Sequence, residues 1–437
     1  MMRTMLVGAA AVCFGLGPAL SADPQSIDWS KIPTKSVTLF YPGESTYEWL
    51  RSPGHAGAKQ VSEGLACLTC HKGSERARGE KIVKGGAVEP TPIPGKNGAV
   101  DVAVQAAHDS EYVYFRFQWK TNMNREGRMH DYVRFDGTKW KWYGHDRNDK
   151  SVRSGEQPPL YEDRFSIMLD DGKVPLYAQQ GCWLTCHNGM RDTKDQVIGD
   201  RVKQHPMLGD AGLKESDVRK YLPATRIDGM SWDKTKSREE IEKLKAEGQF
   251  LDLMQWRAAR SNAVGMADDG YVLEYRNFDS GKSPFSWNVD RKTMMPLYMF
   301  DGVKVGTKAL RAEDIGNPAK PAAIVKEANA VKFDPDAGWR EGDILPGRLL
   351  SRADAKGSAA DNDASFGTWK DGTYTLVWRR KLDTKNPADD KILKVGSTYQ
   401  INFAVHDDNV TTRFHHVSFP LILGIGIDSD IKAVTLN

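Results

Sequence analysis

Cysteine is scarce in this sequence of 437 residues, with five in all. That number is too small for the disulfide framework of a small secreted scaffold. Apolar runs long enough to span a membrane are missing after the first twenty positions, which predicts no membrane span in the mature chain. The charge is almost balanced, with 61 basic and 58 acidic residues, so neither nucleic-acid binding nor a polybasic membrane anchor is indicated. A Ser-His-Asp nucleophile pattern, a phosphate loop and a Rossmann glycine signature are also absent.

The N-terminus has the pattern of a secretory signal peptide. Arg3 supplies a positive charge, residues 5–20 are apolar, and Ala19-Leu20-Ser21 offers small residues for cleavage. We predict that residues 1–22 are removed by cleavage near Ala22, with export to the periplasm. An uncleaved anchor is the alternative, but the apolar run is shorter than the roughly 20 residues that a span needs.

Cleavage removes Cys13 and leaves four cysteines in two pairs, each followed directly by a histidine. The first pair is Cys67-Leu-Thr-Cys70-His71. In this spacing two thiols bond to the vinyl groups of a haem, and the histidine ligates its iron. A thioredoxin-like redox pair, a structural zinc site built from both pairs, and two local disulfides are the alternatives.

The second pair, Cys182-Trp-Leu-Thr-Cys186-His187, has one more residue between the thiols. A widened turn can absorb that residue, and Leu-Thr-Cys-His is repeated from the first motif. We therefore predict a second haem c, with His187 as its proximal ligand. Attachment through one thioether, or a non-covalent haem beside a disulfide, stays open.

His55 lies 12 residues before Cys67, on the segment that leads into the first motif. This position predicts ligation of the opposite face of the first iron, which would give bis-histidine coordination. A surface histidine is the alternative.

The fold class predicted is mainly β with helical insertions. Residues 23–95 form a small helical or irregular c-type haem segment. Residues 96–437 form an antiparallel β-sandwich that binds haem, with a helical insertion around 188–260 that includes the stretch 251–257, and with surface excursions over 309–363. Within the insertion, Ser237-Arg-Glu-Glu240 has the spacing of a capping box and predicts a helix that ends near Gly248. The expected strands follow period-two alternation punctuated by Asp-Gly turns, and they cover residues 101–106, 112–119, 164–169, 271–275, 373–382 and 398–405.

Three stretches together resemble a known family: residues 40–49 leading into the first motif, residues 181–187, and residues 406–420. The chain resembles periplasmic cytochromes that join a c-type haem segment to a haem-binding domain of the ethylbenzene-dehydrogenase gamma-subunit type, related to electron-transfer subunits of the dimethylsulfoxide-reductase family. The resemblance implies a β-sandwich with haem at one end and a redox partner protein. In gamma subunits the haem is non-covalent, with Met and Lys ligands, and the cysteine motif here departs from that pattern.

The distal ligand of the second haem is expected from four histidines, in the order His130, His416, His415 and His406, with Met129 or a lysine as outsiders. His415 and His416 point to opposite faces of a strand, so at most one of them reaches the iron.

Electron transfer by two haems c is therefore the function expected from the sequence, with a partner such as a periplasmic oxidoreductase or a quinol-linked cytochrome. One alternative is a haem enzyme, a small-molecule reductase or peroxidase with an open iron site, using His108-Asp109 or His406-Asp407. The other is a haem-based ligand-binding module. Catalytic residues are not assigned.

Overall fold

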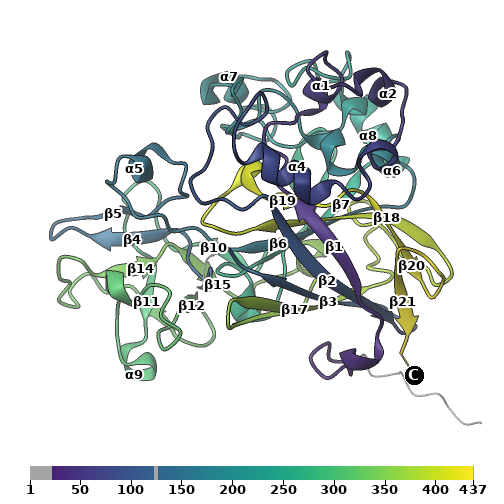
Figure 1. The fold of residues 1–437 in the computed structure, drawn as a ribbon. Coiled ribbons are helices and arrows are strands. Elements are labelled where there is room, and N and C mark those ends of the chain that lie inside the picture. Colours follow the sequence, from purple (N-terminus) through teal and green to yellow (C-terminus); the bar gives the residue numbers. More distant parts are fainter. Residues whose placement is uncertain (1–21, 123–125, 437) are drawn as a thin grey trace, which may run out of the picture.

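The computed structural model describes residues 22–122 and 126–436; the predicted signal peptide, except for Ala22, lies outside them. A 13-stranded sheet dominates the structure (Figure 1). Its path begins with four strands: β16 (Ala364–Lys370), β17 (Thr373–Lys381), β3 (Tyr112–Lys120) and β2 (Ala99–His108). It continues through β1 (Lys35–Phe40), β19 (His416–Val417), β18 (Thr398–His406), β6 (Arg164–Asp170), β7 (Leu251–Arg257), β8 (Gly270–Val272) and β9 (Arg276–Phe278).

Strands β2 and β18 are connected twice across the sheet. At one end the connection runs through β1 and β19, and at the other through β20 (Leu421–Ile425) and β21 (Ile431–Thr435). The two wings of the sheet share one apolar core, in which the ring of Phe117 from β3 lies 4.2 Å from that of Phe165 on β6. The alternation of β3 supplies this contact, because every second residue of a strand faces the same side. The prediction of a mainly β protein with helical insertions is confirmed.

The sheet is mixed, whereas the sequence predicted antiparallel pairing throughout. β21 runs parallel to both β2 and β20. The reason is local. Residues 426–430 return the chain towards the beginning of β20, where Ile431 pairs with Leu423, and β21 then runs in the same direction as β20.

Residues 251–257 form strand β7, and the placement of this stretch in a helical insertion was wrong. β7 pairs with β6 on one side and β8 on the other, and all seven of its residues are buried. Its polar residues fit a buried strand because each has a partner: Asp252 with Arg380, Gln255 with Ser166, and Arg257 with Asp268.

A second, smaller lobe contains much of what the sequence presented as surface excursions. It packs Tyr132, Trp140, Phe300 and Ile344 in a core of its own and lies to the left in Figure 1. Three small sheets build it: β14 (Ile344–Pro346), β4 (Tyr132–Phe135) and β5 (Trp140–Tyr143); β10 (Phe285–Trp287), β15 (Arg348–Leu350) and β12 (Ile324–Val325); and β11 (Tyr298–Phe300) with β13 (Ala330–Lys332).

The helices are short, and most of them gather above one end of the main sheet (Figure 1). They are α1 (Tyr47–Leu50), α2 (Ala58–Ser62), α3 (Cys67–His71), α4 (Glu75–Ile82), α5 (Lys150–Arg153), α6 (Tyr177–Gln180), α7 (Gly199–Lys203), α8 (Arg238–Ala246) and α9 (Gly302–Val305). The predicted capping box at Ser237 starts α8, since Ser237 and Glu240 cap each other. Across residues 22–122 and 126–436, no helix has the length and apolarity to cross a membrane.

Residues 23–95 are joined closely to the large sheet. β1 comes from this segment and pairs along its whole length with β2. α4 packs on the same place: a Cβ on Gly79 would lie 1.9 Å from the carbonyl oxygen of Gly98, so the helix can approach only through a glycine.

Candidate haem-binding site

The first cysteine motif forms a helix of its own. Cys67, Cys70 and His71 lie on the single turn of α3, and both thiols are free. Cys67 is half-buried and Cys70 is exposed. One helical turn therefore presents two thiols and an imidazole together, as covalent haem attachment requires.

His55 and His71 are neighbours in the structure. Their ring centres are 6.1 Å apart, with planes inclined at 50°. In a bis-histidine haem each iron–nitrogen bond is about 2.0 Å and each ring centre lies about 1.1 Å further, which places the ring centres about 6.2 Å apart. The observed spacing fits one iron between two imidazoles.

Hydrogen bonding leaves the nitrogen of His55 that a metal would need. Its Nδ1 lies 2.9 Å from the carbonyl oxygen of Leu50 and donates to it in the neutral tautomer, so Nε2 is available, as in most metal-bound histidines. On the other side, burial lowers the pKa of His71 to about 4, which keeps it a neutral ligand at pH 7. Phe419 stacks on the His71 ring. These residues fit the predicted first haem.

The second motif has a different backbone. Residues Gly181–Thr185 form a 3-10 helix, with Cys186 as its extended C-cap. This winding is tighter than that of an α-helix, so the widened turn expected from the sequence is not what the structure shows. Cys182 is buried and Cys186 half-buried. The ammonium of Lys220 lies 3.0 Å from Cys186 Sγ. Both thiols line a large cavity, so they are free to bond to a ligand within it.

His187 is fully buried and is held at both nitrogens. Its Nδ1 is 2.7 Å from Glu48 Oε1, and its Nε2 lies 3.2 and 3.1 Å from the carbonyl oxygens of Leu184 and Tyr221. The Tyr221 ring stacks on it at 3.9 Å. The carboxylate on Nδ1 is a typical support for a metal-bound histidine, but iron binding at Nε2 would replace two carbonyl contacts.

Helix α1 contacts one histidine near each cysteine motif: His55 near the first and His187 in the second. The carbonyl of Leu50 binds His55, and the carboxylate of Glu48 binds His187 and the backbone N–H of Asn188. The N–H of Tyr47 donates to the carbonyl of Cys186 at 2.6 Å. Tyr47 and Glu48 therefore fix the first segment against the second motif, while Leu50 of the same helix holds His55.

The cavity beside the second motif has a volume of about 1070 Å³, at the upper end of the roughly 300–1,000 Å³ typical of cofactor pockets. Of the four predicted distal ligands, His130, His406 and His415 line it. His416 does not: its Nε2 contacts the carbonyl oxygen of Asn97 at 3.0 Å. The adjacent histidines thus diverge, as strand alternation predicts.

His406 and His415 stack on each other with ring centres 4.6 Å apart. This is too close for an iron between them, so at most one of the two ligates on a given face. Burial lowers the pKa of His415 to about 3 and that of His406 well below its ordinary value, and both are neutral at pH 7. Nδ1 of His406 is buried without a hydrogen-bond partner in the described part of the chain.

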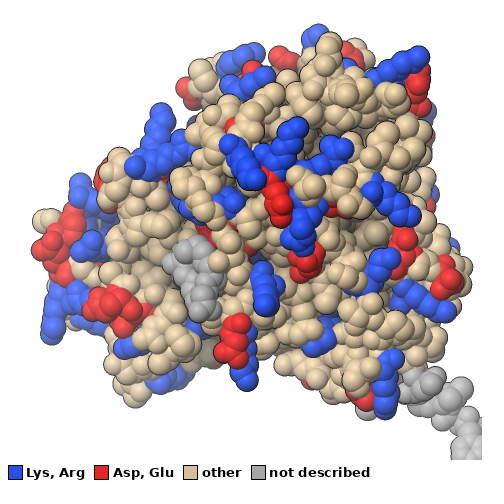
Figure 2. Space-filling view, viewed as in Figure 1, with Lys and Arg blue, Asp and Glu red and all other residues tan. Residues whose placement is uncertain are grey.

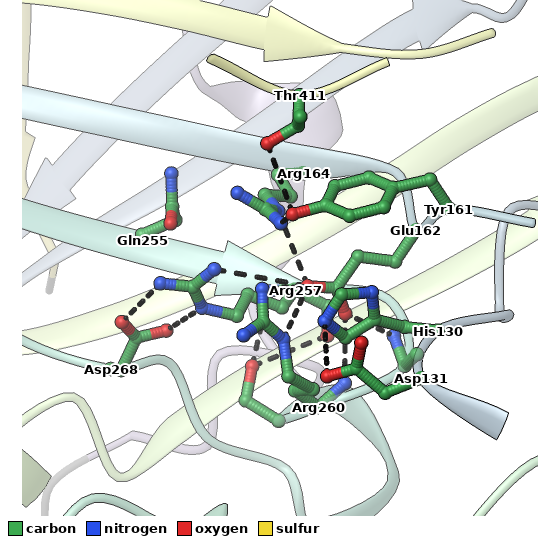
Figure 3. Close-up of polar contacts among 12 residues, drawn as sticks. His130, Asp131, Tyr161, Glu162, Arg164, Gln255, Arg257, Arg260, Asp268 and Thr411 are labelled. Atoms are coloured by element: carbon green, nitrogen blue, oxygen red, sulfur yellow. Dashed lines mark hydrogen bonds and ion pairs between the residues drawn. The ribbon is translucent and has the colours of Figure 1, made fainter. Parts of the chain in front are cut away.

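Buried arginines also line the cavity. Figure 3 shows Glu162 at the centre of this cluster: Arg260 lies 2.7 Å away, Arg164 3.2 Å and Arg257 3.8 Å. The lining also includes Arg276 and Arg348. Asp268 binds Arg257, and Asp131 binds Arg348.

The cluster contains five guanidinium groups and three carboxylates, those of Asp131, Glu162 and Asp268, so it has a surplus of two positive charges. Burial and the charge of Arg257 lower the pKa of Arg276 to about 9, and the guanidinium contacts Gln255 at 3.3 Å. A dianionic group such as the two propionates of a haem would balance the surplus, since arginine pairs well with carboxylates.

Aromatic side chains join the two motifs. Phe419 stacks on His71 with ring centres 6.0 Å apart and on Trp183 at 5.2 Å. Cys67 and Cys182 pack in the same apolar cluster as Phe419 and Trp183. Two motifs that are far apart in the sequence are therefore packed side by side in the structure.

Several residues of the site escaped the sequence analysis. Glu48, Lys220 and Phe419 act through contacts with residues far away in the chain. Glu48 and Phe419 lie in stretches that carry the family resemblance, but their local sequence does not predict these contacts. The arginine cluster had one signal, the pair Arg257 and Arg260 at the end of an apolar stretch, but their partner Glu162 lies about a hundred positions earlier.

Comparisons with known proteins agree with this geometry. The family model described as ethylbenzene dehydrogenase matches residues 26–418. "Cytochrome c-552" of Stutzerimonas stutzeri is 27% identical over 439 aligned positions, which cover 99% of each chain. "Cytochrome c-551" of Rhodocyclus tenuis is 29% identical over 167 positions, covering 38% of this chain and 56% of that protein. The chain belongs to the ethylbenzene dehydrogenase family.

Proposed function

We propose that this protein is an exported dihaem cytochrome c that transfers electrons in the periplasm. The neighbouring pair His55 and His71, spaced at 6.1 Å beside the thiols of α3, carries the proposal. Cys67 and Cys70 would tether the first haem, and the two imidazoles would ligate its iron. Bound haem supplies reversible one-electron oxidation and reduction of iron.

The second haem is assigned to the cavity of about 1070 Å³, tethered by Cys182 and Cys186. The surplus of two positive charges among the buried arginines supports an occupant with two carboxylates. His187 is proposed as one ligand, because Glu48 holds its Nδ1; iron at Nε2 would take the place of its contacts with two carbonyl oxygens. The other ligand is taken from the cavity wall, where His130, His406 and His415 are available.

The protein's own tasks are to hold ligands and exclude water. The apolar cluster that contains both motifs keeps water from the space between them, and α1 fixes their relative position. The relative from Stutzerimonas stutzeri, which is named as a cytochrome c and aligns over 99% of this chain, supports an electron-transfer role.

A redox partner protein is proposed to dock beside the first motif. In Figure 2, basic side chains gather over the upper centre of the molecule, where Figure 1 shows α4. Exposed basic residues near α3 and α4 are Lys59, Lys72, Arg76, Lys81 and Lys84. An acidic partner surface would be attracted to them, and association would slow as ionic strength rises. The candidates for this partner are a periplasmic oxidoreductase and a quinol-linked cytochrome.

The test is a count of covalent haem on the mature protein, produced in a host with cytochrome c maturation. Intact mass and pyridine haemochrome should both give two haems per chain. The double variant Cys182→Ala, Cys186→Ala should retain one covalent haem, and Cys67→Ala, Cys70→Ala should retain the other. A parent protein with one haem, or a Cys182/Cys186 variant with unchanged haem content, contradicts the second site.

Electron paramagnetic resonance on the same samples separates the carrier from an enzyme. The proposal expects both irons to be low-spin and unchanged by added nitrite, peroxide or cyanide. A high-spin signal that shifts on adding one of these molecules would instead indicate an open iron and a haem enzyme.

A further inference from the structure

Five buried aspartates lie close together near the edge of the main sheet that β7, β8 and β9 form. Asp252 lies on β7, Asp269 directly precedes β8, and Asp279 directly follows β9, while Asp389 and Asp390 come from the loop between β17 and β18. Each of the five is at most 5% exposed. Carboxylates are seldom buried so completely unless they are paired or bind a metal.

Their oxygens form two groups of three, and the spacing within each group suits one ion. One oxygen each from Asp252, Asp269 and Asp390 lie within 4.8 Å of one another, and so do oxygens of Asp279, Asp389 and Asp390. Oxygens bound to calcium at about 2.4 Å can be at most about 4.8 Å apart. Asp390 belongs to both groups, so the five residues form one connected cluster.

Many of these oxygens have nothing to bind. Both carboxylate oxygens of Asp279, both of Asp390 and Oδ1 of Asp252 are buried, and no partner in the described part of the chain meets the geometry of a hydrogen bond to them. Thr384 and Asp279 are near Asp390, but they are lesser influences on its pKa. An unpaired buried polar group is costly, and a charged one more so. These five oxygens are therefore the strongest sign that a ligand is bound here.

The neighbouring cations do not balance the cluster. Arg380 donates to Asp252 Oδ2 at 2.6 Å. The ammonium of Lys391 turns away, to Asp170, Asp171 and the carbonyl oxygen of Gly248.

We propose that these five aspartates bind calcium in the two groups that share Asp390. The donors are all carboxylate oxygens, which suits a hard cation, and the cluster contains neither histidine nor cysteine, the preferred ligands of zinc. Five carboxylates drawn from four separate segments make an irregular site of the kind that calcium accepts and that the strict octahedron of magnesium does not.

Bound calcium would link three segments of the sheet edge, namely β7, the residue before β8 and the residue after β9, to the loop that leads into β18. Asp389 also accepts hydrogen bonds from the Ser280 N–H and the Ser358 hydroxyl, both at 2.9 Å, and Asp269 accepts one from Asn362 at 2.6 Å. These contacts hold the carboxylates in place before the ion arrives, which lowers the cost of binding.

The experiment uses the mature holoprotein, stripped of metal with EGTA and desalted. Calcium is titrated by calorimetry, and terbium is used as a luminescent probe excited through the aromatic residues. We expect at least one calcium per chain and a thermal midpoint that rises on adding calcium but not magnesium at the same concentration. The haem absorption spectrum should be unchanged, so this result is independent of the proposed electron transfer.

Variants distinguish a metal site from buried protonated carboxyls. Asp279→Asn and Asp390→Asn should each weaken calcium binding at least tenfold and remove the calcium-dependent rise of the midpoint. The matched control is Asp343→Asn, a buried aspartate whose oxygens are bound by Arg311 and the Arg340 N–H; it should keep both. If the metal-free parent binds no calcium or terbium and its midpoint is the same with and without calcium, the proposal is overturned, whether or not the variants fold.

Discussion

Replacing His55 by alanine tests whether this histidine is the second axial ligand of the first haem. The ring of His55 stands 6.1 Å from that of His71, close to the span of two imidazoles on one iron. Truncation removes one ligand and leaves the cysteines and His71 untouched. We expect one of the two irons to change from low-spin to high-spin, so that half of the low-spin signal disappears in electron paramagnetic resonance.

The cost to the fold should be small, which makes the variant usable. In the structure His55 is half-buried and its ring is hydrogen-bonded to the carbonyl oxygen of Leu50. Losing such a bond costs about 0.5–1.5 kcal/mol of the free energy of unfolding. Covalent haem content should therefore stay at the parent value when measured by pyridine haemochrome.

A second substitution at the same position predicts a change in the reduction potential of the first haem. His55→Met should restore six-coordination and raise the potential of the first haem, because thioether ligation favours ferrous iron. His205→Ala is the control, since this histidine instead contacts the carbonyl oxygen of Asp233. If His55→Ala keeps the whole low-spin signal and binds no added cyanide, the assignment of His55 as a ligand is wrong.

Three further predictions concern stability. Glu48→Gln should lower the free energy of unfolding by about 1.5–3 kcal/mol, the usual worth of a hydrogen bond to a charged group, and denaturant titration would show it; an unchanged midpoint would mean that Glu48 does not support the second motif. Burial lowers the pKa of His416 from 6.5 to about 4. Between these two pH values the His416 imidazole is protonated in the unfolded state but neutral in the folded state. The free energy of unfolding therefore falls as the pH drops from 6.5 to 4, by about 1.4 kcal/mol per pH unit. His416→Gln should remove that part of the slope, and identical pH profiles would contradict the reasoning. Gly79→Ala should cost about 1–3 kcal/mol by overpacking, because its Cβ would lie 1.9 Å from the Gly98 carbonyl oxygen; Ala77→Ser on the exposed side of the same helix should change stability by less than about 0.5 kcal/mol.

Features that depend on neighbours in the sequence were predictable. Alternation located β3 and β17 almost to the residue, because side chains on a strand alternate between its faces whatever surrounds it. The spacing Ser237 to Glu240 located the start of α8 for the same kind of reason, since a capping box is closed within one turn. The stretch 251–257 failed because a strand buried on both faces loses its alternation, and its polar residues are explained by partners that the local sequence does not contain.

The sequence by itself determined the two cysteine-histidine motifs, since covalent attachment depends on spacing within a single turn, and it also determined the β class of the protein. Only the tertiary structure decided that His55 lies beside His71, that His415 rather than His416 reaches the cavity, and that five aspartates meet at the sheet edge. Contacts of this kind join residues separated by up to hundreds of positions, as Lys96 and Asp407 are. Their physical origin is the packing of whole strands and helices, which fixes distances that no short stretch of sequence encodes.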